Sequence, residues 1–286
     1  MNKKFKTDWS KTLVKIQDMD SKKNGSSFKD ERIYYPQFNE HGVAQAIIRF
    51  LPSPDTDIPF VSVRSHSFKG VGGWLIENCP TTIKKECPVC KGNSGLWDSD
   101  PDLVRIRKRK LNYYSNVLVV KDPANPENEG KVYLYKYGKK VHDKILEKIQ
   151  PGEGSIDQPI VVFDYYEGAD FKLIIKKIKV GKDLMPNYDS CNFDSISCVG
   201  TDDEIESINS KLYPLSDFIS EDKFKPYSEL ETKYNSVVGL STESNHRESN
   251  QVRTQQPQTH AKPVTKVADT AVFDGDDSDF FKELQN

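Results

Sequence analysis

The stretch that decides the fold runs from Tyr113 to Tyr137. It reads Tyr113-Tyr114-Ser115-Asn116-Val117-Leu118-Val119-Val120, then a loop, then Lys131-Val132-Tyr133-Leu134-Tyr135-Lys136-Tyr137. Both outer segments are rich in β-branched and aromatic residues, which predicts two strands. The residues between them, 122–130, contain two prolines, two asparagines and a glycine, which is typical of a loop. In the second strand three tyrosines alternate with other residues, so their rings share one face.

Further elements follow on both sides of this stretch. Apolar runs predict strands over 44–51, where Pro52 stops the first one, and over 61–63, 159–163 and 171–180. Helical spacing of Val141, Ile145 and Ile149 predicts a helix that ends before Pro151. A second helix is predicted through Ile205, Ile208 and Leu212, entered at Thr201-Asp202, where Thr201 serves as a cap.

One group of residues has the spacing of a metal site. Twelve residues separate His66 from Cys79, seven separate Cys79 from Cys87, and two separate Cys87 from Cys90. Thiolates and imidazole suit Zn²⁺, and these four side chains complete a tetrahedron around one ion. The alternative is a redox Cys-x-x-Cys pair beside an unrelated histidine, but the βαβ setting of a thioredoxin-like motif is missing.

The same residues favour a structural zinc over a catalytic one. Four protein ligands leave no open position for water or substrate. The zinc deaminase signature is also absent, because Phe68 stands where its glutamate belongs and Glu86, not proline, precedes Cys87. We therefore expect no catalytic residues and no enzyme. A zinc-dependent nuclease or deaminase, and an interaction scaffold whose zinc knuckle binds proteins, are the two rival interpretations.

A basic and aromatic segment follows the predicted zinc site. Residues 105–148 contain twelve lysines and arginines against five acids, which favours binding to a phosphate backbone. Aromatic rings beside such cations are what sequence-tolerant binding of unstacked bases requires, so the pattern favours single-stranded nucleic acid. The alternative is that some of the tyrosines belong to the core. The candidate DNA-binding residues are Arg105, Arg107, Lys108, Arg109, Lys110, Tyr113, Tyr114, Tyr135, Tyr137, Lys139, Lys140, Trp74 and Trp97.

The two ends of the chain differ in charge, although the total is only −2. Residues 1–24 form a basic arm with seven lysines against three acids. Residues 241–268 are rich in Ser, Thr, Gln and Asn, which predicts a disordered linker. Residues 269–286 contain six acids against one lysine and form an acidic tail. No signal peptide or transmembrane segment is recognisable, so we expect a cytoplasmic protein.

These observations combine into one predicted architecture. The fold is expected to be mainly β with some helix: an OB-fold core, that is, a five-stranded Greek-key barrel, with an inserted zinc subdomain and flexible tails. The predicted domains are an arm over 1–24, a core over 25–240 that includes a zinc subdomain at about 60–110, and a linker and tail over 241–286.

The sequence resembles the single-stranded DNA-binding proteins of T-even-type bacteriophages, the gene 32 or helix-destabilising proteins. The match is densest from Tyr113 to Pro123 and from Pro126 through Tyr135 to Gly138-Lys139-Lys140. Arg49-Phe50-Leu51-Pro52, the His-Cys-Cys-Cys set and Lys223-Phe224-Lys225 also resemble this family. Roughly residues 40–235 take part in the resemblance, which implies that Tyr188, like Trp97, Tyr113 and Tyr135, lies near the DNA groove and binds DNA.

The resemblance implies a non-enzymatic protein that coats single-stranded DNA, without sequence preference, in phage replication, recombination and repair inside the infected bacterium. It implies cooperative self-association through the arm, here Lys3, Lys4, Lys6 and Thr7. It also implies that the tail binds replication and recombination proteins such as a polymerase, a helicase loader and a recombinase mediator. The tail residues concerned would be Asp274, Asp276, Asp277, Asp279, Phe280 and Phe281.

Overall fold

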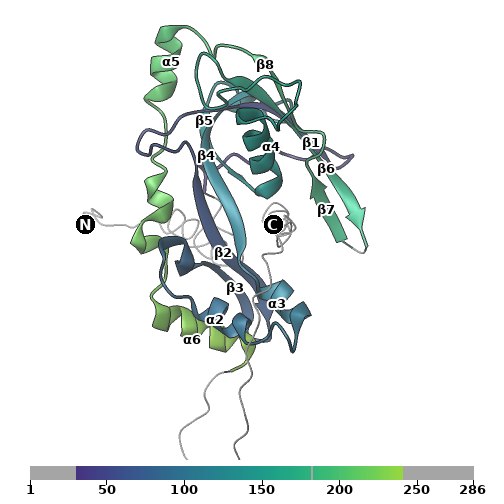
Figure 1. Cartoon of the computed structure of the whole chain (residues 1–286), viewed down its shortest axis with the longest axis vertical. Coiled ribbons are helices and arrows are strands. Elements are labelled where there is room, and N and C mark those ends of the chain that lie inside the picture. Colours follow the sequence, from purple (N-terminus) through teal and green to yellow (C-terminus); the bar gives the residue numbers. More distant parts are fainter. Residues whose placement is uncertain (1–29, 182, 241–286) are drawn as a thin grey trace, which may run out of the picture. The chain divides into compact units, whose positions relative to one another are not determined.

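The computed structural model describes residues 30–181 and 183–240, and these divide into two compact units (Figure 1). Of the described residues, unit 1 contains 30–63 and 112–219, and unit 2 contains 64–111 and 220–240. Two strands, β2 (Val61–Gly70) and β4 (Lys110–Lys121), have residues in both. The predicted basic arm, the linker and the acidic tail lie outside the described residues.

Unit 1 is built on a curled antiparallel sheet. Its strand β1 (Val43–Phe50) lies between β4 and β6 (Ala169–Val180); β5 (Val132–Tyr137) pairs with β4, and β8 (Asn192–Ile196) pairs with β6. A further strand, β7 (Asp183–Asn187), forms a hairpin with β6. The predicted β-rich core is therefore confirmed as a curled half-barrel, in which the strands β5-β4-β1-β6-β8 are part of a sheet of eight strands.

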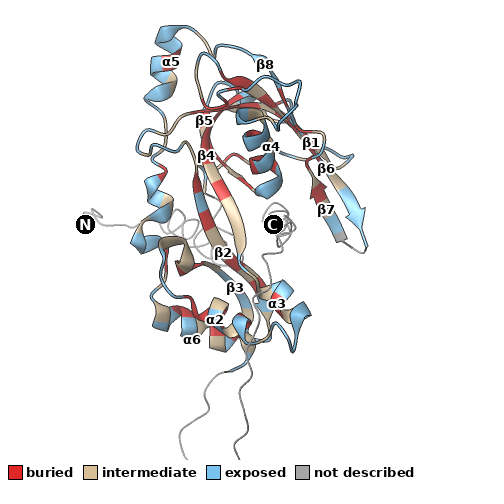
Figure 2. Cartoon of the chain, in the orientation of Figure 1, coloured by how far each residue is buried: buried red, intermediate tan, exposed pale blue. Residues whose placement is uncertain are grey.

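The core of unit 1 centres on Phe50 at the end of β1, which is completely buried. Its ring lies 5.7 Å from each of the rings of Tyr137, Phe163 and Phe171, and 6.4 Å from that of Tyr135. β1 pairs with β4 on one edge and with β6 on the other, and Ala44, Ala46 and Ile48, which share a face with Phe50, are also buried. The buried stretches of these strands are red in Figure 2.

Two helices of unit 1 form where the apolar spacing predicted them. Helix α4 (Lys139–Ile149) buries Val141 and Ile145. Helix α5 (Asp202–Asn209) starts with a capping box, in which the Thr201 hydroxyl accepts a hydrogen bond from the Glu204 amide and the Glu204 carboxylate accepts one from the Thr201 amide. Short 3-10 turns complete the unit: η2 (Pro126–Asn128) and η3 (Ser216–Ile219).

The strand predicted over 159–163 is wrong. The segment runs through turns, with hydrogen bonds from the Val162 amide to the Ile160 carbonyl and from the Asp164 amide to the Val161 carbonyl. Ile160, Val162 and Phe163 are buried although the backbone turns, and Val161 is exposed, so most of the apolar run reflected burial and not extension.

Unit 2 consists of the β2–β3 hairpin and several short helices. After β3 (Gly73–Asn78) come η1 (Pro80–Ile83), α2 (Pro88–Ser94) and α3 (Pro101–Arg107); η4 (Glu221–Lys223) and α6 (Tyr227–Val238) join them from far along the chain. The hairpin packs Phe68 and Leu75 against Leu230, Tyr234 and Val237 of α6. Among residues 30–181 and 183–240 no helix is both long and apolar enough to cross a membrane.

A close backbone approach joins the hairpin turn to α6. The Gly72 amide donates to the Val237 carbonyl at 3.0 Å, and a Cβ atom at Gly72 would clash with the Ser236 carbonyl. We therefore expect Gly72→Ala to lower the free energy of unfolding by about 1–3 kcal/mol, because the backbones must separate. Urea unfolding followed by circular dichroism measures this.

Gly95→Ala is the matched control. Gly95 has an ordinary φ of −80° and no neighbouring atom within 4 Å of an added Cβ. The free energy of unfolding of the Gly95→Ala variant should change by less than about 0.5 kcal/mol. Equal effects of the two substitutions would contradict the packing described for Gly72.

Candidate metal centre and nucleic-acid interface

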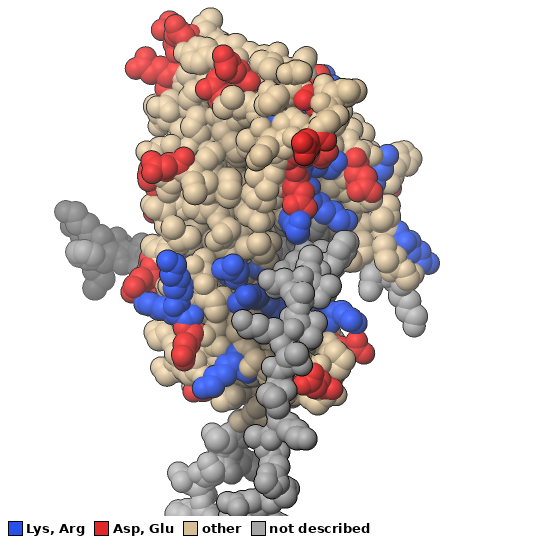
Figure 3. All heavy atoms as spheres, in the orientation of Figure 1, with Lys and Arg blue, Asp and Glu red and all other residues tan. Residues whose placement is uncertain are grey.

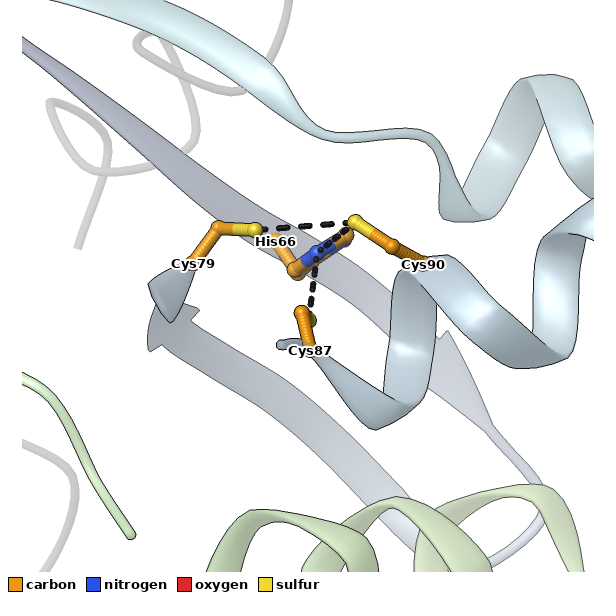
Figure 4. Close-up of side chains that lie close together, drawn as sticks. All are labelled: His66, Cys79, Cys87 and Cys90. Atoms are coloured by element: carbon orange, nitrogen blue, oxygen red, sulfur yellow. Dashed lines mark hydrogen bonds between the residues drawn. The ribbon is translucent and has the colours of Figure 1, made fainter. Parts of the chain in front are cut away.

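Four side chains of unit 2 converge on one point (Figure 4). His66 comes from β2, Cys79 from the residue that follows β3, and Cys87 and Cys90 from the start of α2. Pro80 and Pro88 come directly after two of the cysteines and start the next helical turns, because proline is suited to the first turn of a helix. The local sequence therefore turns the chain sharply at both places and points the thiols inward.

The spacing of the four ligand atoms fits a tetrahedral metal ion. All lie within 4.8 Å of one another. The sulfurs of Cys79 and Cys90 are 3.6 Å apart, and Nε2 of His66 lies 3.5 Å from the sulfurs of both Cys87 and Cys90. With metal bonds of about 2.3 Å to sulfur and 2.0–2.1 Å to nitrogen, a tetrahedral zinc ion places its ligand atoms roughly 3.5–3.8 Å apart. The cluster could thus hold one metal ion, and its donor set fits zinc.

Neighbouring groups orient the His66 ring so that it can bind a metal ion. Nδ1 of the buried His66 lies 3.0 Å from the Arg107 carbonyl oxygen. We assign the ring proton to Nδ1, which donates this hydrogen bond, so that the lone pair of Nε2 faces the three sulfurs. The hydroxyl of Thr81 lies 3.1 Å from the Cys79 sulfur and supplies a further outer contact.

The cluster also shifts the acidity of its members. Hydrogen bonds from Cys87 and Cys90 hold the pKa of the Cys79 thiol below its ordinary value. Burial lowers the pKa of His66, but hydrogen bonds to Cys79 and Cys90 outweigh it and raise that pKa to about 9. Without a metal ion the cluster therefore favours a Cys79 thiolate beside a protonated His66, whereas hydrogen bonds with Cys79 and Cys90 raise the pKa of the Cys87 thiol. Binding of a cation would displace the proton from Nε2 of His66.

The basic run 105–110 is held in place by contacts with this cluster. The Arg107 carbonyl accepts hydrogen bonds from His66 and from the Asn93 amide, at 3.0 Å each. The Arg107 guanidinium lies 5.7 Å from the centre of the Phe68 ring, and Arg109 donates to the Thr81 hydroxyl at 3.4 Å. The backbone that carries these cations is therefore positioned by the same residues that gather the ligands.

Both tryptophans that were predicted to contact DNA are accessible in unit 2. Trp97, between α2 and α3, is 55% exposed, and Trp74 on β3 is 46% exposed. Arg105 and Arg109 are exposed, and Arg107, Lys108 and Lys110 are half-buried. Figure 3 shows basic side chains gathered over the elements of unit 2 on the face in view. Unit 2 therefore combines cations with accessible rings.

The tyrosines of unit 1 require a correction to the expected base-stacking row. Tyr135 and Tyr137 do share a face of β5, but that face is the core: Tyr135 is 1% exposed, and both rings pack near Phe50. The Tyr137 hydroxyl lies 2.9 Å from the Ser115 hydroxyl, and burial raises its pKa. A base could reach these rings only if the core opened, so their predicted role does not fit this structure.

The other residues of unit 1 that were predicted to contact DNA differ in their exposure. Tyr113 is buried and stacks on His142, with ring centres 3.7 Å apart, and Tyr114 stacks on Phe218 at 4.2 Å. Tyr188 is buried. Lys139 and Lys140 are exposed at the start of α4, where Lys139 forms an ion pair with Asp143.

Sequence reasoning missed the residues that support the metal centre. Asn93 and Thr81 hold the Arg107 backbone and the Cys79 sulfur, and α6 supplies the apolar side of unit 2. The spacing of Leu230, Tyr234 and Val237 was a usable signal for α6. The carbonyl of Arg107 left no signal, because any residue type carries one.

Fold and site together define a β-rich binding protein with a candidate metal centre and an adjoining basic, aromatic surface. The profile of the family described as gp32 DNA binding protein like matches residues 42–238. The chain is 39% identical over 228 residues to the single-stranded DNA-binding protein of Enterobacteria phage T2, covering 77% of this chain and 74% of the relative. It is 37% identical over 254 residues to that of Enterobacteria phage T4, covering 86% and 79%. The chain belongs to the gp32-like DNA-binding family.

The metal site makes a prediction. We expect the purified chain to contain one equivalent of tightly bound metal, and Cys87→Ser to lose most of it, because a hydroxyl is a poor substitute for a thiolate ligand. Elemental analysis after gel filtration measures the content and identifies the metal.

Cys198→Ser serves as the control, since Cys198 is exposed and lies outside the cluster. It should retain the full equivalent. Full occupancy in Cys87→Ser would contradict the assignment of Cys87 as a ligand.

Proposed function

We propose that this chain is a sequence-independent single-stranded DNA-binding protein that coats and protects exposed strands during phage DNA replication, recombination and repair. One observation carries the proposal: in a chain of the gp32-like family, a basic segment with accessible tryptophans nearby is anchored to a four-ligand cluster. Two relatives are named single-stranded DNA-binding proteins. The activity is binding and not catalysis.

The cluster of His66, Cys79, Cys87 and Cys90 holds one structural zinc ion. Three thiolates and one imidazole suit zinc and occupy all four of its positions. The free energy of metal binding becomes folding free energy for the short elements of unit 2. Its effect on DNA binding is indirect: it holds the carbonyl of Arg107, and with it the basic segment, in place.

The DNA interface consists of phosphate contacts and base contacts. Arg105, Arg107, Lys108, Arg109 and Lys110, together with Lys139 and Lys140, neutralise the backbone. The exposed rings of Trp97 and Trp74 stack on bases, which duplex DNA does not offer as free faces. Tyr114 makes an additional contact with the DNA. Tyr113, Tyr135, Tyr137 and Tyr188, which are buried, support the fold.

The remaining parts of the chain have roles at both sides of this interface. The arm, 1–24, makes cooperative contact with the neighbouring protein on the strand through Lys3, Lys4, Lys6 and Thr7. The acidic tail within 241–286 competes with DNA for the basic surface and binds replication and recombination proteins through its acids and Phe280-Phe281. The core is 25–240, and the protein acts in the cytoplasm of the infected bacterium.

Base stacking by Trp97 can be measured with a short oligonucleotide. We expect Trp97→Ala to weaken binding to (dT)8 by about 1–3 kcal/mol, or roughly 5- to 150-fold, because one ring–base stack is lost. Fluorescence titration at fixed low salt gives the affinity.

Ile156→Ala is the control, because Ile156 is almost fully exposed and lies outside the proposed interface. Its affinity should equal that of the unchanged chain. Absence of fluorescence quenching with poly(dT), or equal affinity for duplex DNA, would contradict the proposed function itself.

Truncated chains test the roles of the two ends of the chain independently. Removing 241–286 should tighten binding by about tenfold at low salt, and less as salt rises, because the tail's negative charge is screened by salt. Removing 1–24 should abolish cooperativity on poly(dT) and leave (dT)8 binding intact. Weaker binding without the tail, or persistent cooperativity without the arm, would each contradict the role assigned to that segment.

A further inference from the structure

The hairpin formed by the end of β6 and by β7 has the character of a contact surface. β1 pairs with β6 only as far as Lys176, and the Lys177 amide donates to the Gly42 carbonyl at 2.9 Å; the residues of β6 beyond Lys177 are paired with β7. Here the alternating burial of β6 stops, and Val180 and Leu184 are 54% and 56% exposed. Such aliphatic side chains beside cations form the usual mixture of an apolar centre and a charged rim.

The charge of this hairpin is one-sided. In this stretch β6 carries Lys176, Lys177 and Lys179 and no acid. Lys176 and Lys179 are exposed, and neither forms an ion pair with the described residues, whereas the Lys177 ammonium lies 4.7 Å from the centre of the Phe38 ring. Like charges that lie close together repel one another, so a surface of opposite charge would relieve that repulsion.

A surface of opposite charge lies at the other end of β6. It consists of Glu167 and of four acids on α5, and neither 161–171 nor 197–210 contains a lysine or arginine. Two hydrogen bonds join the loop to the helix: the Tyr165 hydroxyl donates to Asn209 at 3.0 Å, and the Tyr166 hydroxyl donates to Asp202 at 2.9 Å. Figure 3 shows acidic side chains over α5.

This acidic surface also carries exposed apolar side chains. Tyr166 and Ile196 are each about half exposed, and Ile196 pairs with Ala169, two residues after Glu167. Glu167 and Glu206 form no ion pair within the described part of the chain. Both surfaces therefore combine exposed apolar groups with unpaired charge, and the two charges are opposite.

We propose that the β6–β7 hairpin of one copy docks on the acidic α5 surface of the next copy. Within one copy the two surfaces cannot meet, because they lie at opposite ends of β6, which is about 30 Å or more at roughly 3.3 Å per residue. A contact between different surfaces is heterologous and leads to an open row of subunits. Such a row matches a protein that coats a strand, so this inference rests on the proposed function and adds a core-to-core contact to it.

DNA is the other class of partner that lysines attract. It would account for the hairpin but not for the acidic α5 surface, from which phosphates are repelled. The exposed hairpin residues Ile178, Val180 and Leu184 also offer no ring for base stacking. A second copy accounts for both surfaces at once.

The experiment compares poly(dT), which is long enough for many copies, with (dT)8, whose length is within the roughly 4–16 nucleotides that one OB-fold covers. We expect Lys176→Glu/Lys179→Glu in the full chain to lower the apparent affinity for poly(dT) by about tenfold and to leave (dT)8 binding within about twofold, because like charges then face each other between copies. Glu167→Lys/Glu206→Lys should have the same effect. The chain with all four substitutions should regain cooperativity, since the charges are complementary again.

Lys121→Glu/Lys131→Glu, two exposed lysines of unit 1 that lie outside both surfaces but within the basic residues 105–148, is the control: any loss of affinity should be equal on (dT)8 and poly(dT). Thermal unfolding of every variant verifies folding. Equal loss on (dT)8 and poly(dT) would show that the hairpin binds DNA, and unchanged cooperativity would show that it binds nothing between copies; either overturns this inference. Failure of the unchanged chain to bind (dT)8 would instead overturn the proposed function.

Discussion

The gathering of His66, Cys79, Cys87 and Cys90 at one point is the constraint on which unit 2 depends. The elements around it are short: η1 has four residues and α2 and α3 have seven each, too few to be stable as isolated helices. Their apolar support is a single cluster between the β2–β3 hairpin and α6. Four candidate ligands come from three separate places in the chain, and a metal ion held by them would close these short elements onto the core.

The position of the basic run 105–110 depends on one backbone atom, the carbonyl oxygen of Arg107. His66 is held at Nε2 by the cluster and at Nδ1 by the Arg107 carbonyl, so one ring joins the metal centre to the basic segment. Asn93 holds the same carbonyl from α2. Cations on such a fixed backbone lose less conformational freedom on binding a phosphate chain than cations on a free loop would.

Unit 1 follows a different constraint, the aromatic core around Phe50. The rings of Tyr135 and Tyr137 on β5 turn inward to this core, which removes them from the surface. Opposite charges lie toward the two ends of β6. Unit 1 therefore uses these two tyrosines for packing.

The sequence by itself determined the ligand set, the basic segment and most elements of unit 1, because each depends on residue type and short spacing. Cys87-Pro-Val-Cys90, the run from Arg105 to Lys110 and the apolar periods of β1, β4, β6, α4 and α5 are local patterns. Only the tertiary structure decided which face of β5 is buried, because alternation places Tyr135 and Tyr137 on one side without saying which side meets Phe50. It also decided that Arg107 supports His66, since a carbonyl carries no sequence signal, and that 159–163 turns, since burial and extension produce the same apolar run.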